Sequence, residues 1–338
     1  MQEDKKTPKN KTAPKKQKRG KKNDTPQKAT PETNPKTTPK PKEEEVAQPL
    51  GQPVVQQETP PLEEADFLNF TPPSKEFVEN ISSPFYAYFT PKFLGLDNID
   101  NSRPHFFVGY HTLLSITDVL YITELFLRKD IMLRSLGDSF HFQVPGWGRF
   151  WERMGVVKAS RENCTRLMQA GENVLVFPGG AREAFKRKNE QYKVNWQNRS
   201  GFARMAIEHN YPIIPLASVG WEDAVDIVYD AEDFMNTWLG QLLKYTGLAK
   251  YIRDGEELPP LVKGIGWTLL PRPERLYMSF GEPIDVSEFA GRAEDKTAQM
   301  AVRERVERSI KKQMDELLKF RASDMENMGW LRRWFMKG

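Results

Sequence analysis

The sequence predicts an α/β fold in which a mostly parallel sheet is flanked by helices. Three short apolar runs without charged side chains have the length of buried strands, and they span Phe106–Tyr110, Asn173–Phe177 and Pro212–Val219. Segments of helical composition separate these runs along the chain. Strands that alternate with helices favour a layered α/β domain with parallel strands.

Residues 1–65 form a tail rich in Lys, Pro and Thr that we expect to be disordered, because it has too few large apolar side chains to offset the entropy of ordering. The first 42 residues contain 14 Lys and Arg against 4 Asp and Glu, a net charge of +10. Since the whole chain carries +4, the remainder carries −6. Such a tail attracts any polyanion. A solvated tail without a specific partner is the first interpretation, a membrane tether the second and nucleic-acid binding the third.

The folded domain is predicted to span residues 66–290. The aromatic run Phe85–Phe89 indicates an amphipathic first helix, for which packing on the core is favoured over a place at a bilayer surface. Phe140–Glu152 is rich in Gly and aromatic residues and predicts an ordered loop that leads into a helix. The next helix is expected to begin after Ser160, a typical N-cap residue, and to end at Gly171.

A helix is also predicted over Thr112–Leu127, directly after the first strand. Strand and helix together are long enough to cross a membrane, but they contain His111, Asp118 and Glu124. Acidic groups are costly in a span that faces lipid, so a buried helix of a globular core is the better interpretation. We therefore expect a peripheral protein that meets the cytoplasmic face of a membrane from one side.

The second half of the chain predicts further helices over Arg182–Lys188, Gly201–His209 and Asp233–Tyr251, and a strand over Leu276–Phe280. The helix expected over Asp233–Tyr251 carries an apolar stripe, for which packing on the core is favoured over a place at a membrane interface. The stripe comprises Phe234, Met235, Trp238, Leu239, Leu242 and Leu243.

A C-terminal extension is predicted over residues 291–338. It begins with a charged amphipathic helix over Lys296–Phe320. It ends in Trp330–Phe335, where aromatic residues alternate with arginines as they do in segments that anchor at a lipid surface.

Several classes of site are excluded by what the sequence lacks. None of its histidines, His105, His111, His141 and His209, has the spacing of a zinc site, so we expect no metal. The single Cys164 excludes an internal disulfide, and the tail lacks the apolar run of a signal peptide. No Gly-x-Ser-x-Gly, Walker phosphate loop or dinucleotide Gly-x-Gly-x-x-Gly is present, so no redox cofactor is expected.

His111 is the candidate base, because it ends the first strand at the edge where α/β sheets present functional groups. If the following segment is helical, Asp118 lies nearly two turns later on the same face and can orient the imidazole. The turn at Pro178, Gly179 and Gly180 lets the backbone approach an anion closely, and Arg182 supplies a forked cation.

These blocks, in this order, resemble the glycerolipid and lysophospholipid acyltransferases. They are the His with its downstream Asp, Gly148–Arg153, Val174–Arg182 and Tyr211–Pro215. The form Phe-Pro-Gly-Gly-Ala-Arg-Glu is most similar to the diacylglycerol-acyltransferase-like branch. The resemblance covers about residues 104–283.

The resemblance implies an O-acyltransferase that moves a fatty acyl group from acyl-CoA or acyl carrier protein to a lipid hydroxyl, of a lysophospholipid, lysophosphatidate or acylglycerol. In this reading His111 is the general base and Asp118 its partner, and no cofactor is needed beyond the acyl donor. The residues implied to bind the substrates are Arg153, Phe177, Pro178, Gly179, Gly180, Arg182 and Pro215.

Two departures from the family pattern keep other interpretations open. Six residues, Thr112–Thr117, separate His111 from Asp118 where the family usually has four. Gly179 stands where the phosphatidate-forming members usually carry Glu, which makes a neutral acceptor as plausible as lysophosphatidate. The alternative is a non-catalytic protein, on a decayed acyltransferase fold, that associates with membranes or nucleic acid.

Overall fold

The structure of the protein is a computed structural model that describes residues 67–139, 142, 146–249, 258–325, 328–330 and 334. The predicted tail over residues 1–65 lies outside the described residues. So do the end of the helix expected at Asp233–Tyr251 and most of Trp330–Phe335.

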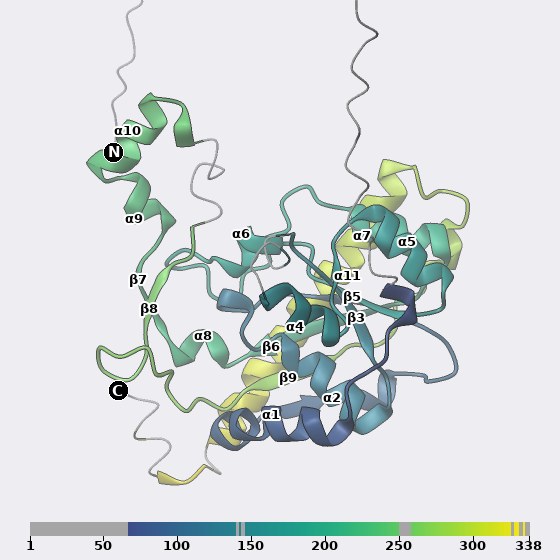
Figure 1. The fold of residues 1–338 in the computed structure, drawn as a ribbon, viewed down its shortest axis with the longest axis horizontal. Coiled ribbons are helices and arrows are strands. Elements are labelled where there is room, and N and C mark those ends of the chain that lie inside the picture. The colour runs from purple at the N-terminus through teal and green to yellow at the C-terminus, as the bar shows by residue number, and fades with distance from the viewer. Residues whose placement is uncertain are drawn as a thin grey trace, which may run out of the picture. The chain divides into compact units, whose positions relative to one another are not determined.

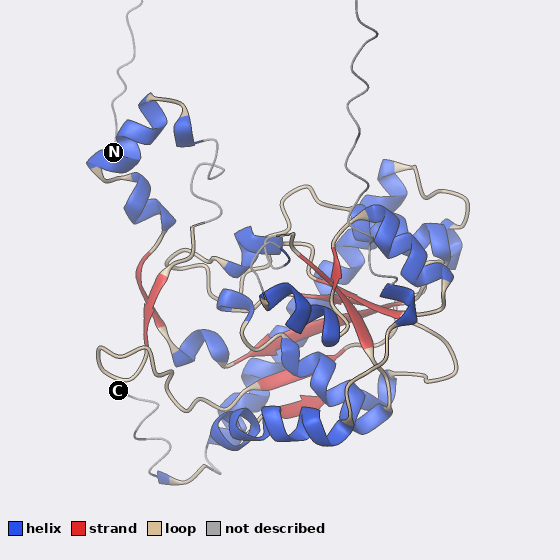
Figure 2. Cartoon of the chain, in the orientation of Figure 1, coloured by secondary structure: helices blue, strands red, loops and turns tan. Residues whose placement is uncertain are grey.

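A twisted sheet of seven strands runs through the described part of the chain, in the order β1-β9-β6-β2-β5-β3-β4. Every pairing in it is parallel except that of β6 with β9, so the predicted, mostly parallel sheet is confirmed. Figure 2 shows the red strands crossing the molecule between layers of blue helices. The strands are β1 (Lys92–Leu94), β2 (Phe106–Gly109), β3 (Leu133–Gly137), β4 (Val157–Lys158), β5 (Asn173–Val176), β6 (Ile213–Val219) and β9 (Tyr277–Phe280).

Helices cover both faces of this sheet (Figure 1). One face is covered by α5 (Arg161–Gln169), α7 (Gly201–His209) and α11 (Lys296–Asp324). The other is covered by α1 (Lys75–Phe89), α2 (Val119–Lys129) and α8 (Trp221–Ala224). The connections contain α4 (Trp147–Arg153) and α6 (Gly180–Ala184), and short 3-10 turns lie at Phe67–Asn69, Leu96–Asn98, Leu113–Ser115 and Ser287–Phe289.

A smaller element stands apart from the main sheet. It consists of the antiparallel pair β7 (Asp226–Tyr229) and β8 (Leu261–Lys263), together with α9 (Ala231–Met235) and α10 (Trp238–Tyr245). Figure 1 shows this element at one side of the molecule, away from the seven-stranded sheet.

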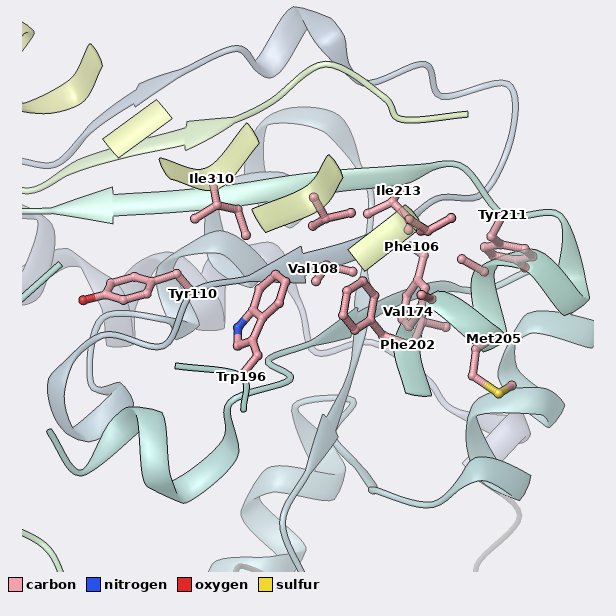
Figure 3. Close-up of a cluster of buried hydrophobic side chains, with 14 of the residues drawn as sticks. Phe106, Val108, Tyr110, Val174, Trp196, Phe202, Met205, Tyr211, Ile213 and Ile310 are labelled. Atoms are coloured by element: carbon pink, nitrogen blue, oxygen red, sulfur yellow. The ribbon is translucent and has the colours of Figure 1, made fainter. Parts of the chain in front are cut away.

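The core explains why the central strands are apolar on both faces. Phe106 and Val108 of β2 point into the cluster beneath α7 and α11, while Phe107 between them belongs to the cluster beneath α2. Figure 3 shows Phe106, Val108 and Trp196 packed with side chains of α7 and α11. Trp196 is 1% exposed, so this side chain closes the core next to Tyr110 at the end of β2.

Helix α11 crosses the centre of the sheet against β6. Its buried stripe consists of Val302, Val306, Ile310, Met314 and Leu317, at the spacing of one helical face. Its C-terminal end is fixed by Asp324, which accepts hydrogen bonds from Lys92 Nζ at 2.6 Å, Arg275 Nη1 at 2.7 Å and the Tyr277 hydroxyl at 2.8 Å.

Three predicted helices differ from the observed elements. Over Thr112–Leu127 the chain first makes a 3-10 turn, and the α-helix begins only at Val119. The helix expected over Arg182–Lys188 is the five-residue α6, which begins at Gly180 and ends at Ala184. The helix expected from Asp233 onward is broken into α9 and α10, and Trp238, Leu239 and Leu242 are exposed, so core packing is wrong for them.

None of the helices in the described ranges combines the length and the apolar character that crossing a bilayer requires.

Candidate active site

The loop between β2 and α2 brings His111 and Asp118 together. Leu114 and Ser115 adopt positive φ angles of 59° and 57°, which reverse the chain so that Asp118 returns to the end of β2. A left-handed conformation is costly for a branched side chain such as Leu, so the surrounding packing must hold it. This turn accommodates the six residues between His111 and Asp118. The contact therefore does not depend on a shared helical face.

The imidazole of His111 is oriented by Asp118. Nδ1 lies 2.6 Å from Asp118 Oδ2 and 3.0 Å from the Ser115 hydroxyl. The other carboxylate oxygen, Oδ1, accepts hydrogen bonds from the Thr112 hydroxyl at 2.8 Å and the Thr112 N–H at 3.2 Å. Asp118 is buried, and 17% of the His111 side chain stays exposed. A carboxylate in this position favours the tautomer with the proton on Nδ1, which leaves Nε2 to accept one.

The predicted glycine turn lies beside this pair. The ring of Phe177, at the end of β5, stacks on the His111 ring with centroids 4.3 Å apart and an interplanar angle of 13°. Parallel pairing of Val108 with Val176 places the two strand ends side by side. Arg199 Nη1 donates to the carbonyls of Pro178 at 3.0 Å and Gly179 at 2.6 Å, so the guanidinium fixes the turn.

Two further residues, Glu183 and Lys186, hold the main chain of His111. Glu183 Oε2 accepts the His111 N–H at 3.0 Å, and Oε1 accepts the Asn195 N–H at 2.9 Å. Lys186 Nζ donates to the carbonyls of His111 and Glu183, both at 2.9 Å. The sequence analysis missed both residues. The sequence analysis placed both residues in the helix expected over Arg182–Lys188, and no local pattern indicates that their side chains turn back toward His111.

The same lysine connects the site to a buried polar network. Lys186 Nζ lies 3.5 Å from Glu222 Oε1 and 4.2 Å from the centroid of the Tyr110 ring. Glu222 also accepts hydrogen bonds from the Tyr110 hydroxyl and from the Tyr192 N–H. Burial raises the pKa of Glu183 and of Glu222, and the Lys186 ammonium opposes both shifts. The buried Lys186 ammonium thus stabilises the negative charge of two buried carboxylates next to His111.

Arg182 lines a small cavity of about 170 Å³, but its guanidinium is already bound to Glu190. Its guanidinium makes two hydrogen bonds with Glu190, Nη1 to Oε2 at 2.9 Å and Nη2 to Oε1 at 2.5 Å. The residue is 8% exposed, so its fork is occupied by a carboxylate of the same chain. The predicted contact of Arg182 with a substrate phosphate stays a prediction, which requires Glu190 to move away.

Arg153 and Pro215 lie apart from the glycine turn. Pro215 belongs to the buried strand β6, opposite Val108. Arg153 lines a groove of about 860 Å³, together with Arg149, Phe77 and Phe150. The groove is bordered by β4, two strands beyond β5 in the sheet. With about 4.8 Å between neighbouring strands, β4 is roughly 14 Å from β2 and shares its carboxyl edge.

Among the described side chains, no group of three or more His, Cys, Asp and Glu is arranged to hold a metal ion. The site that these residues do form is a base, its orienting acid, a glycine turn and a nearby apolar groove with cations at its side. Such an arrangement can deprotonate a hydroxyl beside a long apolar substrate.

The chain is similar to proteins that are named as acyltransferases or as lipid-synthesising enzymes. The family model described as diacylglycerol acyltransferase matches residues 79–308. Phytyl ester synthase 2 of Arabidopsis thaliana, a chloroplastic protein, is 31% identical over 247 residues, which cover 68% of this chain and 34% of that protein. The DGAT1/2-independent enzyme synthesizing storage lipids of Bos taurus is 32% identical over 122 residues, 36% of each protein. The chain thus spans about a third of the length of these relatives.

The comparison with solved structures includes an acyltransferase. It is the 1-acyl-sn-glycerophosphate acyltransferase PlsC of Thermotoga maritima, with a TM-score of 0.40 and 14% sequence identity. The similarity covers 71% of this chain and 79% of that one.

Proposed function

Because the chain belongs to the diacylglycerol acyltransferase family, we propose that it transfers a fatty acyl group from a thioester to the hydroxyl of a neutral lipid. The observation that carries the proposal is the contact of His111 Nδ1 with Asp118 at 2.6 Å, beside a glycine turn whose Phe177 stacks on the imidazole. The stacking of Phe177 on His111 and the hydrogen bond from His111 N–H to Glu183 join two sequence blocks that are about 70 residues apart.

The reaction follows from the protonation state of the imidazole. His111 Nε2 takes the proton from the acceptor hydroxyl as its oxygen attacks the thioester carbonyl. Asp118 stabilises the imidazolium that forms. The carbon–sulfur bond then breaks, the thiolate leaves with the proton returned by the imidazolium, and the products are an ester and a free thiol.

A neutral acceptor is supported by the state of Arg182. Since Glu190 occupies this guanidinium, Arg182 does not present its fork to a phosphate. Gly179 cannot carry a side chain either, because a Cβ there would lie 2.4 Å from Glu183 Oε2. The names of the relatives, a phytyl ester synthase and an enzyme synthesizing storage lipids, point to acceptors of the same kind. We therefore assign a long-chain alcohol or an acylglycerol as the acceptor.

The groove near β4 suits the acyl donor. Phe70, Phe77, Phe150 and Met154 give it an apolar lining for a fatty chain. Arg149 and Arg153 stand four residues apart, on one side of α4, and supply cations for the phosphates of coenzyme A. Because both substrates reside in or at a bilayer, the protein acts as a peripheral protein at a membrane surface.

The test uses purified full-length protein with a long-chain acyl-CoA and a panel of acceptors: diacylglycerol, monoacylglycerol, phytol and lysophosphatidate. We expect ester formation, with release of free CoA, on the neutral acceptors. His111→Ala should lower turnover by about 10³-fold and Asp118→Asn by about 10²-fold, because general-base catalysis contributes about 10²–10⁴-fold.

His209→Ala is the matched control, since this histidine ends α7 and is predicted to leave turnover unchanged. Preference for lysophosphatidate would refute the assignment of the acceptor class. Wild-type turnover in His111→Ala would refute the assignment of the base. The absence of turnover with every donor and acceptor would favour the non-catalytic alternative.

A further inference from the structure

Helix α10 presents its apolar side chains to solvent. Trp238 is 78% exposed and Tyr245 is 91% exposed, and Leu239 and Leu242 are exposed as well. Positions 238, 242 and 245 follow the i, i+4, i+7 spacing, so they form one stripe along the helix. The side chains of Trp238, Leu239, Leu242 and Tyr245 are called the α10 face below.

The orientation of α10 is set by its opposite side. A Cβ at Gly240 would lie 2.5 Å from Phe234 O and from Met235 Cα, so only glycine permits the close contact with α9. Gln241 Nε2 also donates to Met235 O at 2.9 Å. Thr237 caps the start of the helix by accepting the Gly240 N–H at 3.2 Å. The helix is therefore fixed with its small residue inward and its large apolar residues outward.

A second apolar group lies at the other end of the β7–β8 pair, in the 264–270 loop. Trp267 is 84% exposed and Leu269 is 77% exposed. The loop is ordered by backbone hydrogen bonds from Gly264 to Thr268 O and from Ile265 to Leu270 O, each 2.7 Å long. Lys263 Nζ lies 4.6 Å from the centroid of the Trp267 ring. An ordered loop thus holds a tryptophan and a cation together at the surface.

Both groups belong to the element that stands apart from the main sheet (Figure 1). Strand β7 leads from α8 to α9, and β8 leads directly into the 264–270 loop. Arg272 fixes the base of this element, since Nη1 and Nη2 bond both carboxylate oxygens of Asp226 at 3.0 and 2.8 Å. One anchored unit therefore carries both apolar groups.

The charges of the two segments are complementary to a phospholipid surface. Residues 238–249 and 261–270 contain two lysines, Lys244 and Lys263, and no Asp or Glu. A surface that combines Trp, Tyr and Leu with Lys suits the layer of lipid headgroups. There the rings and aliphatic side chains contact acyl chains, and the ammonium groups contact phosphates. We propose that the α10 face and the 264–270 loop insert into the headgroup layer of a phospholipid bilayer and dock the protein there.

The test measures the binding of full-length protein to phosphatidylcholine vesicles by flotation in 0.5 M salt, where the charge of residues 1–42 contributes little. The first variant combines Trp238→Ser, Leu242→Ser and Tyr245→Ser, and the second combines Trp267→Ser with Leu269→Ser. We expect the partition coefficient to fall about 100-fold in the first variant and about 10-fold in the second, because each insertion buries large apolar side chains. Since these side chains are exposed, the unfolding temperature should stay unchanged.

The comparison variant combines Trp330→Ser with Trp334→Ser, which are 74% and 66% exposed and belong to the C-terminal segment that the sequence suggests as a rival lipid anchor. It should bind vesicles as the wild-type protein does. Wild-type binding by both α10-face and loop variants would overturn the proposal. The proposal would also be overturned if the wild-type protein were a dimer and the first variant a monomer, because a second copy would then cover the α10 face. The assay measures no turnover, so its outcome is distinct from that of the acyl-transfer test.

Discussion

At the scale of single residues, Glu183 explains why the turn contains glycine at position 179. The carboxylate of Glu183 occupies the space that a side chain at Gly179 would need. From there it accepts the N–H of His111, while Lys186 donates to the carbonyl of the same residue. The peptide groups on both sides of the base are thus held by two buried charged side chains, and we expect Glu183 to act as a positioning residue.

Glu183→Gln should lower kcat about tenfold and leave KM for both substrates nearly unchanged. The charge-assisted bond to His111 N–H becomes weaker, and a tenfold effect corresponds to about 1.4 kcal/mol. Initial rates over a matrix of donor and acceptor concentrations measure the two constants separately.

Glu222→Gln is the control for this variant, because Glu222 is equally buried and also lies near Lys186, yet it binds Tyr110 and Tyr192 rather than His111. Both variants should lose similar stability, and only Glu183→Gln should lose turnover. Equal losses of kcat in the two would show that Glu183 has a structural role alone.

The sequence predicted the proximity of some of these residues and not of others, for physical reasons. His111 and the glycine turn end neighbouring parallel strands, and apolar runs reveal such strands. The fold of the 111–118 loop depends on positive φ angles at Leu114 and Ser115, which no local pattern indicates. Arg182 was expected to be available to a phosphate. Its partner Glu190 stands eight residues away, beyond any helical spacing rule.

At the scale of secondary-structure elements, the strands formed by uninterrupted apolar runs and the helices with clear caps were predictable. Ser160 accepts the Asn163 N–H as an N-cap, and β2, β5 and β6 lie where the apolar runs placed them. The strands β1, β3, β4, β7 and β8 were missed, because each contains a charged residue and therefore lacks the uninterrupted apolar run that identifies β2, β5 and β6. The outward orientation of the α10 side chains was also missed, since a stripe of apolar residues does not reveal whether it faces the core or solvent.

Helix α4 is the element that tests the donor groove. A double variant, Arg149→Ala with Arg153→Ala, should raise KM for acyl-CoA about tenfold and leave kcat nearly unchanged. The arginines are proposed to bind phosphates that do not react, so they contribute equally to the ground state and the transition state. Steady-state rates at a saturating concentration of acceptor give both constants.

The control for α4 replaces two exposed cations of α11, Arg308→Ala with Lys312→Ala, and is expected to leave both constants unchanged. A rise in KM for the acceptor instead of the donor would move the arginines to the other substrate, as the resemblance to the acyltransferase family implies for Arg153.

At the scale of the whole molecule, the alternation of strands and helices was sufficient to predict the layers. It did not predict that β9 runs antiparallel to β6, or that β1 joins the sheet beside β9. Nearly 200 residues separate β1 from β9 in the chain, and pairing over such a distance leaves no pattern in either segment.

The charge distribution of the whole chain predicts two separable modes of membrane binding. Neutralising six cations of the tail, by Lys→Gln at 15, 16, 18, 21 and 22 and Arg19→Gln, should weaken binding to phosphatidylserine vesicles at least about tenfold in 0.1 M salt, because each cation near such a surface contributes about 1 kcal/mol. Binding to phosphatidylcholine should not change. Flotation at several salt concentrations measures both, and an unaltered salt dependence in the variant would contradict the prediction.

The position of α11 across β6 has a consequence for biosynthesis. The side chains of Val302, Val306 and Ile310 complete the core around strands that are translated much earlier, and β9 supplies the neighbour that β1 needs. Before α11 is synthesised, Phe106 and Ile213 therefore lack the part of their cover that this helix supplies, although α5 and α7 pack on the same face. Until α11 emerges from the ribosome, this apolar surface stays exposed and makes the nascent chain prone to aggregation.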